Sequence, residues 1–495
     1  MHSKSVEVID NIIIKDSSIT GESLTNIYKD AVKYAPSKIV GTLINLIMVF
    51  IYTNLLSPKQ YGLYMVATAV ISFLAIIFSD WIGVSALRFF KEHFKKDNIE
   101  SYFSTILFLL VSNLLIMYLA GFLFFKPIEK FFQIPSNFLL FVMILIIPIA
   151  VRALLFQILR AQIKPLTYTF SVIINQLLTV GTAIFLIKQF HFGAIALLIG
   201  MGFSIVLIDI IMIFQTKYHK SVDHEKIQLS ILTGLYKYGM PLALSSLGMW
   251  TITQSNRFIL QHFNGSSYNG QLGVGYNLTF SIMLPLFSII SMAAIPRLFS
   301  KYESGIDVKP IISKLVEFYF VIFVPITFIL CIYPKEIVSI FSNSKFSDAF
   351  ILIPFLAISA FCLGLTEITA AQYQLAKKTS IDMNIRLASG FSGILLNIAL
   401  IPKLGLLGIG IATIVSNFLY LLLSFIIRID DLIWEMPYKS IIKSSIILIL
   451  CLGMSILLRN FFNPMNGLYF ILHIAVIIST YTVLIKKSSF LKQNY

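Results

Sequence analysis

Charged residues are scarce in this chain. Asp, Glu, Lys and Arg make up 12% of its 495 residues, whereas hydrophobic residues make up 57%. Soluble domains carry about 25% charged residues, so the composition excludes a soluble globular protein. The mean hydropathy is +0.87, and the apolar residues form runs near the ~20 residues that a bilayer-spanning helix needs. The chain is therefore predicted to be an all-α polytopic membrane protein.

Cysteine and long polar stretches are also rare. The three cysteines, Cys331, Cys362 and Cys451, each lie in an apolar run at no metal-ligand spacing. We therefore expect no metal site and no cofactor. The longest internal polar stretch, 216–237, is too short to fold as a catalytic domain. Residues 1–35 lack the apolar core of a signal peptide, so the first span is expected to direct insertion.

Fourteen apolar runs are long enough to be membrane spans. They cover 36–56, 62–87, 103–125, 136–156, 167–187, 193–215, 238–260, 272–296, 313–333, 348–373, 384–401, 406–427, 441–459 and 467–485. An even number of spans places both termini on the same side of the membrane.

Basic residues indicate which side that is. Of the 38 Lys and Arg residues, 29 lie in the termini, in every second loop or at adjoining helix ends, and 9 lie elsewhere. Basic loops stay in the cytoplasm, so we predict a multi-pass membrane protein with both termini in the cytoplasm. This distribution also accounts for the net charge of +15, so we expect no nucleic-acid partner.

The chain repeats itself. KYAPSKIVGTLINL near Pro36 resembles KYGMPLALSSLGMW near Pro241, and Gly193 matches Gly408. Two six-helix halves entering from the same side predict a pseudo-two-fold axis along the membrane normal, with a site between the halves. The expected organisation is a cytoplasmic segment 1–35, a first half 36–215, a linker 216–237, a second half 238–427, a linker 428–440, two extra helices at 441–485 and a tail 486–495.

A polar stripe runs along the seventh predicted span. Ser246, Trp250, Thr253 and Arg257 recur at helical spacing within 241–260. A charge inside a span costs a few kcal/mol and is by default a functional hypothesis. Arg257 either snorkels to the interface or lines a water-filled central cavity.

Other spans offer similar stripes. Span 1 has Lys38, Thr42, Asn45 and Tyr52, span 2 has Tyr64, Thr68, Ser72 and Ser79, and span 8 has Asn277, Ser281, Ser288 and Ser291. Packing alone would also explain serine and threonine in membrane helices. Aligned stripes in both halves favour a polar cavity. Asp80 and Glu367 are further embedded charges and are candidate ion-coupling residues.

Short motifs in a characteristic order give the chain a family resemblance. They are LLSPKQYGLY at 55–64, YGMP at 238–241, SNRFIL at 255–260, LGVGY at 272–276 and IPKLGLLGIGIA at 401–412. With these motifs and fourteen spans, the chain looks like a Wzx-like bacterial polysaccharide flippase. This group belongs to the multidrug/oligosaccharidyl-lipid/polysaccharide exporter superfamily. The family often has Asp-Arg where this chain has Asn256-Arg257, so the carboxylate beside the arginine is missing.

The resemblance implies a substrate and roles for the candidate residues. The substrate would be an undecaprenyl-diphosphate-linked oligosaccharide that crosses from the cytoplasmic to the outer leaflet, made by glycosyltransferases and used by a polymerase of the same pathway. Its polar head needs a wet, cationic path. The substrate-binding candidates are Arg257, Arg88, Lys38, Asn45, Tyr52, Trp250, Gln254, Tyr276 and Asn277. The lipid tail would stay in the bilayer, along spans 13 and 14.

Two other functions remain open. A multidrug or small-solute exporter of the same superfamily is one, although such exporters usually have twelve spans. A membrane-embedded polysaccharide polymerase or transferase is the other, but the outer loops are short and carry no His, Asp or Arg cluster. We therefore expect a transporter rather than an enzyme.

Overall fold

The computed structural model describes residues 38–95, 98–162, 165–216, 226–461 and 467–487. These residues are almost entirely helical, and none of them forms a β-strand. The all-α prediction is therefore confirmed. The predicted N-terminal segment 1–35 and most of the tail 486–495 lie outside the described residues.

Helices occur at all fourteen predicted spans, but the count of fourteen stays a prediction. Twelve helices in the described part of the chain are long and apolar enough to cross a membrane. The other two predicted spans fall on α9 (Leu229–Asn264) and α18 (Gly467–Lys487). α9 is rich in polar side chains, and the apolar part of α18, Leu468–Leu484, is shorter than the rest.

The contacts divide the described chain into two compact units. Unit 1 contains the described residues up to Val49, then Gly275–Ile385, and the described residues from Thr413 onward. Unit 2 contains Phe50–Val274 and Arg386–Ala412. The six-helix halves at 36–215 and 238–427 and their symmetry axis stay predictions.

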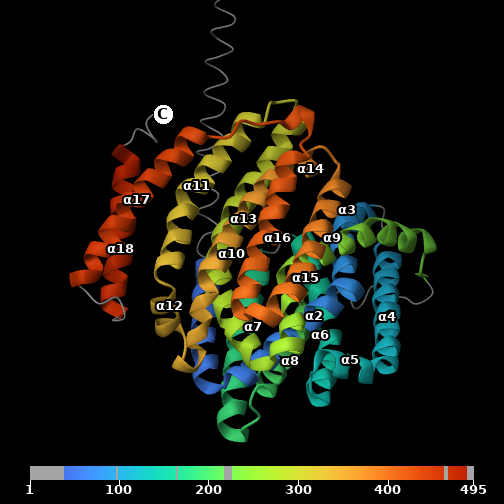
Figure 1. Cartoon of the computed structure of the whole chain (residues 1–495). Coiled ribbons are helices and arrows are strands. Elements are labelled where there is room, and N and C mark those ends of the chain that lie inside the picture. The colour runs from blue at the N-terminus through green and yellow to red at the C-terminus, as the bar shows by residue number, and fades with distance from the viewer. Residues whose placement is uncertain (1–37, 96–97, 163–164, 217–225, 462–466, 488–495) are drawn as a thin grey trace, which may run out of the picture. The chain divides into compact units, whose positions relative to one another are not determined.

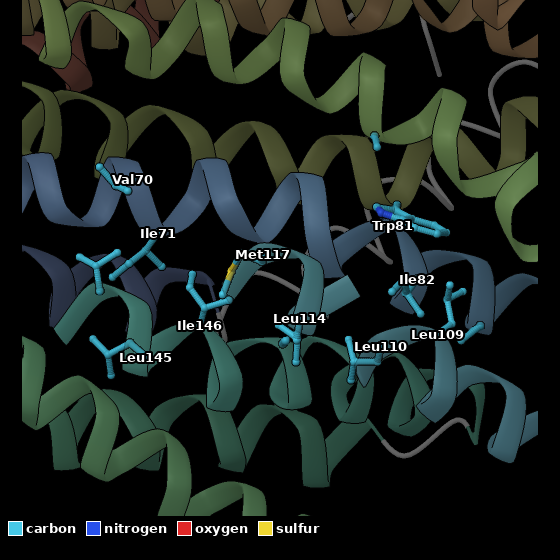
Figure 2. Packing of buried hydrophobic residues seen from close by; sticks show 14 of the residues in the cluster. Val70, Ile71, Trp81, Ile82, Leu109, Leu110, Leu114, Met117, Leu145 and Ile146 are labelled. Carbon is cyan, nitrogen blue, oxygen red and sulfur yellow. The ribbon is translucent and has the colours of Figure 1, made fainter. Parts of the chain in front are cut away.

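Unit 2 is a bundle of long helices. Its main elements are α2 (Pro58–Ala75), η1 (Ile76–Asp80), α3 (Trp81–Lys95), α4 (Ile99–Leu123), α5 (Phe125–Phe132), α6 (Ser136–Ala161), α7 (Pro165–Phe190), α8 (Ile195–Thr216) and α9, with parts of α10 (Ser266–Glu303), α15 (Thr379–Leu404) and α16 (Leu406–Ile426). α8 packs against α6 and α7, and α3 packs against α6 and α9. Residues such as Ile82, Ile106 and Ile146 are fully buried in its core, part of which is shown in Figure 2.

Glycines allow two close helix contacts in unit 2. A Cβ on Gly62 of α2 would lie 1.7 Å from the main-chain oxygen of Ser266, and one on Gly270 would lie 2.2 Å from that of Pro58. The start of α10 therefore touches α2 backbone to backbone, as small residues permit in membrane helices. The YGLY motif and the segment before LGVGY thus have a packing role.

The YGMP motif has a similar explanation. A Cβ on Gly239 of α9 would lie 2.3 Å from the ring of Trp81 and 2.5 Å from the hydroxyl of Ser85, both on α3. The Ser85 hydroxyl also donates to the main-chain oxygens of Trp81 and Leu235. Because glycine leaves room for the indole, α9 can pack closely on α3.

Unit 1 holds the remaining helices. They are α11 (Lys309–Ile332), α12 (Pro334–Phe341), η4 (Ser344–Ile351), α13 (Ile353–Thr369), α14 (Ala371–Leu375), η5 (Asp430–Leu432), α17 (Tyr438–Phe461) and α18, with parts of α10, α15 and α16 and the start of the helix Lys38–Leu55. α17 packs on both α18 and α11, and the pair α17 and α18 is coloured red in Figure 1. The Tyr333 hydroxyl lies 2.6 Å from the Ser455 hydroxyl and 3.2 Å from Nδ1 of His473. This buried polar contact attaches the two extra helices to the end of α11.

The region around 261–272 differs from the expected polar loop. Only Gly265, with φ of 81°, separates α9 from α10, and α10 begins at Ser266. α9 also begins at Leu229, inside the stretch expected as a linker, because Ile231 and Leu235 are buried in the core of unit 2.

Candidate functional site

The polar stripes of α2 and α9 face each other in unit 2. The Trp250 indole N–H donates to the Ser72 hydroxyl at 3.0 Å. Further along α9, Arg257 Nη1 donates to the Met65 main-chain oxygen at 3.0 Å. From the first contact to the second, the chain advances seven residues along α9 but goes back seven residues along α2. The two helices therefore pack antiparallel. We call Met65, Thr68, Ser72, Trp250 and Arg257 the α2–α9 seam.

Arg257 is the charged residue of this seam. Its side chain is buried, with 5% of its surface exposed. The Met65 oxygen that it contacts also accepts from the Thr68 hydroxyl at 2.8 Å. This carbonyl is neutral, so the contact orients the guanidinium without cancelling its charge. Arg257 is therefore held against α2, and whether it snorkels or lines a cavity stays a prediction.

Tyrosine rings surround this position. Tyr64 of α2 lies close enough to interact electrostatically with Arg257. Its ring contacts Tyr52 edge-on at 6.5 Å between centroids, and Tyr61 at 6.3 Å. The Tyr52 side chain is buried, and its hydroxyl has no hydrogen-bond partner among the described residues. Tyr52, Tyr61 and Tyr64 thus form one cluster of aromatic rings.

A buried amide network fixes the end of α9, and sequence reasoning missed it. Asn269 Nδ2 donates to the Arg257 main-chain oxygen at 3.0 Å and to Gln261 Oε1 at 3.1 Å. Gln261 Nε2 in turn donates to the Ser266 hydroxyl at 2.9 Å and to the Gln133 main-chain oxygen at 3.2 Å. The only available signal was the cluster of amide and hydroxyl residues at 261–271, which is also typical of a flexible loop.

Most of this region lies within the match to a protein-family model. The model described as polysaccharide biosynthesis protein matches residues 27–302, more than half of the chain. The chain belongs to the polysaccharide biosynthesis protein family. The match includes both helices of the seam. No curated protein matches the chain.

Solved structures share the fold of this family member. The lipid II flippase MurJ in an inward closed conformation matches with a TM-score of 0.72 and 15% identity, over 92% of this chain and 97% of MurJ. An inward-facing multidrug resistance MATE transporter of the MOP superfamily matches at 0.66 and 12%, over 79% and 93% of the two chains. A mutant of the Vibrio cholerae MATE transporter VcmN matches at 0.57 and 14%, over 83% and 97%. The chain therefore has the MurJ and MATE transporter fold.

The family resemblance drew attention to position 256. Asn256 is buried, and its Oδ1 has no hydrogen-bond partner among the described residues. Oε1 of the half-buried Gln254 also has no hydrogen-bond partner among the described residues. A carboxylate in place of Asn256 would need a cationic partner inside the bundle, because burying an unpaired charge is costly.

Trp250 lies in an apolar environment. Its ring packs against Phe73 at 4.9 Å and Phe258 at 5.5 Å between centroids. The role of this tryptophan as a platform for a sugar stays a prediction.

Two further candidates of unit 2 lie away from the seam's arginine. Asp80 is half-buried at the end of the π-helix η1, and Arg88 is exposed on α3. A π-helical turn inside a helix often marks a functional site. Eight residues of helix separate the two groups by about 12 Å, so they occupy different levels of the bundle.

The remaining candidates belong to unit 1. Lys38 and Asn45 are half-buried on the helix Lys38–Leu55, Asn277 is half-buried on α10 and Glu367 is half-buried on α13. Tyr276 stacks on Phe280 with 4.1 Å between centroids.

One hydrogen bond joins two of these segments. The Thr42 hydroxyl donates to the Ser281 main-chain oxygen at 3.0 Å. Asn45 and Asn277 each lie about one helical turn from this contact. Unit 1 therefore brings the predicted stripes of spans 1 and 8 side by side.

The seam has a definite chemical character. It buries a permanently charged guanidinium between the helices α2 and α9. A guanidinium offers planar, paired donors that suit phosphate oxygens. The arrangement is suited to binding an anion once the seam is accessible to it.

Proposed function

We propose that this protein is a flippase for an isoprenoid-diphosphate-linked oligosaccharide. It moves the lipid from the cytoplasmic to the outer leaflet by alternating access, for synthesis of a cell-surface polysaccharide such as O-antigen, lipopolysaccharide or capsule. The observation that carries the proposal is the buried guanidinium of Arg257 in a family whose name refers to polysaccharide biosynthesis. A diphosphate-sugar head cannot cross hydrocarbon unaided.

The candidate residues are assigned roles in moving the head group of the lipid across the membrane. Arg257 binds the diphosphate, and Lys38 and Arg88 attract the head at the cytoplasmic mouth. Asn45, Gln254 and Asn277 donate hydrogen bonds to sugar hydroxyls, and Tyr52, Trp250 and Tyr276 pack on sugar faces. Asp80 and Glu367 couple transport to an ion.

The setting of the protein is part of the proposal. It acts in the bacterial inner membrane with cytoplasmic termini, and it receives its lipid from glycosyltransferases and delivers it to a polymerase. The protein works as a transporter and not as a polymerase or transferase. The fold supports this because the matching solved structures are named as a flippase and transporters.

Multidrug export is the second candidate, since MATE transporters share the fold. The family match favours the flippase, because its description refers to polysaccharide.

Reconstitution tests the proposal. Purified protein is placed in vesicles that hold undecaprenyl-diphosphate-linked oligosaccharide on the inner leaflet, and a glycosidase added outside reports the lipid that crosses. We expect cleavage to exceed that in protein-free vesicles. Cleavage equal to that in protein-free vesicles, together with export of a cationic dye, would replace the flippase with the exporter.

A further inference from the structure

Unit 2 contains an apolar cavity, and of the residues proposed above to bind the head group, all in the described part of the chain, only Trp250 lines it. Its volume is about 750 Å³, and its walls come from α2, η1, α4, α5, α6 and α9, with Ile394 of α15. The lining is mostly aliphatic and aromatic, and includes Phe73, Phe124, Phe132, Trp250 and Phe258. None of the described residues that line it is charged. Val70 and Met117, which also line it, are labelled in Figure 2.

The few polar side-chain groups in the lining already have partners. The Trp250 indole N–H donates to Ser72, and the Ser255 hydroxyl donates to the Thr251 main-chain oxygen at 2.6 Å. A polar or cationic ligand would lose its hydration there without compensation. The chemistry of the walls therefore selects a hydrocarbon.

The short helix α5 covers one side of the cavity and connects α4 to α6. Phe124 and Phe131 are 58% and 65% exposed and lie at its edge. α5 ends at Gln133 in the left-handed conformation, with φ of 50°, and the Gln133 carbonyl accepts from Gln261 of α9. In the proposed topology this connection faces outward, so the end of the cavity that α5 covers lies on the outer side.

The cavity adjoins the seam on a single helix. Arg257 contacts α2 through its guanidinium, while the next two residues, Phe258 and Ile259, line the cavity. One turn of α9 thus offers a cation and an apolar wall side by side. This combination matches an amphiphile with an anionic head and a long hydrocarbon tail.

We propose that the cavity binds a segment of the isoprenoid tail of the lipid-linked substrate. This inference rests on the proposed function and adds a tail site in unit 2, separate from helices α17 and α18. An apolar cavity stays dry and binds apolar groups. A tail that fills the cavity would hold the head group near Arg257 as the lipid reaches the outer leaflet.

Photolabelling tests the site. The full-length protein in nanodiscs is irradiated with a diazirine-tagged polyprenyl phosphate that carries no sugar, and labelled peptides are identified by mass spectrometry. We expect labels on α4, α5 and α9, competed by untagged polyprenyl phosphate. Leu74→Trp, which fills the cavity, should reduce them about tenfold, because losing contact with a couple of methylene groups is enough for that change.

Matched controls separate filling from misfolding. Leu119→Trp changes the same residue type on α4 at a side chain that is 65% exposed and does not line the cavity, so its labelling should equal that of the wild type. If Leu74→Trp lowers the yield of folded protein, Ile128→Trp on the surface helix α5 repeats the test, with Ile116→Trp as its control. Undiminished labelling in the folded filling variants overturns the inference.

A second probe distinguishes the tail from ordinary membrane lipid. A diazirine-tagged diacyl phospholipid at the same mole fraction should label these peptides weakly, and equal labelling would overturn the inference. Because the polyprenyl probe lacks sugar and labelling requires no transport, the result is independent of the flippase assay. Labelling without translocation would contradict only the proposed function, and translocation without labelling would contradict only the tail site.

Discussion

At the scale of the residue, Arg257 is held inside unit 2. It is buried and donates to the Met65 carbonyl of α2, while its place at the interface or on a central cavity stays a prediction. The antiparallel packing of two polar stripes has closed over it. The seam must open before an anion can reach the guanidinium, which fits a transporter that alternates between states.

The prediction at this scale concerns Arg257→Lys and Arg257→Ala. Lysine keeps the charge but lacks the planar fork, so we expect transport of the lipid-linked oligosaccharide to fall about tenfold, the effect of about 1.4 kcal/mol. Arg257→Ala should lower it further. The measurement is the vesicle assay described above, on protein shown to insert at normal levels.

A surface arginine provides the comparison. Arg160 is exposed at the end of α6, and its guanidinium donates to Gln157. Arg160→Ala should leave transport near the wild-type rate. Wild-type transport by Arg257→Ala would remove Arg257 from the mechanism and leave it as a packing residue.

At the scale of the element, the family-like motifs are places where helices touch. Gly62 lies in YGLY and Gly239 in YGMP, and a methyl group at either would overlap a neighbouring helix. Membrane helices gain no hydrophobic driving force from packing together, so close van der Waals contact carries more of their association. The motifs therefore define the packing of α2, α3, α9 and α10 as much as any binding role.

The prediction at this scale compares Gly62→Ala with Gly181→Ala. The first places a methyl group against the Ser266 backbone and should destabilise the fold by about 1–3 kcal/mol, as overpacking does. A Cβ on Gly181 of α7 would have no neighbouring atom within 4 Å, so alanine there should be neutral or stabilise by up to about 1 kcal/mol. Thermal unfolding in detergent measures both. Equal midpoints for the two variants would contradict the backbone contact.

At the scale of the whole molecule, the distribution of basic residues predicts the orientation in the membrane. The skew of 29 to 9 extends over all the loops, so no single span determines the prediction. The outward placement of α5 and its cavity depends on this orientation.

The prediction at this scale is that both termini are cytoplasmic. A reporter that is active only outside the cytoplasm should be silent when fused after Tyr495, and active when inserted after Lys126, near the start of α5. Western blotting establishes that both fusions are made. An active fusion after Tyr495 with a silent one at Lys126 would invert the topology.

The sequence by itself determined the class of the protein and much of its local structure. Long apolar runs cannot leave backbone groups unpaired in a bilayer, so they form helices, and helices occur at all the predicted runs. The periodic stripes of α2 and α9 also identified the faces that meet in unit 2. The ends of the helices were harder to predict from the sequence. α9, for example, begins at Leu229 because its first turns pack against the core.

The glycines of the repeat show a similar limit. The sequence offset pairs Gly193 with Gly408. In the structure, however, the counterpart of Gly193 is Gly405, because both lie in a turn between two helices. Gly193 and Gly405 have φ of 57° and 53°. Residue identity alone does not reveal which of several nearby glycines adopts the left-handed conformation, because the surrounding turn decides it.

Only the tertiary structure decided what the polar residues of the stripes contact. Arg257 donates to a main-chain carbonyl, a group that every residue carries, so no sequence pattern could have named Met65. The contact of Gln261 with the Gln133 carbonyl and the apolar cavity beside Trp250 depend in the same way on segments distant in the chain. Periodicity specifies which face of a helix is polar, whereas the partner of that face is set by packing among helices that the local sequence does not encode.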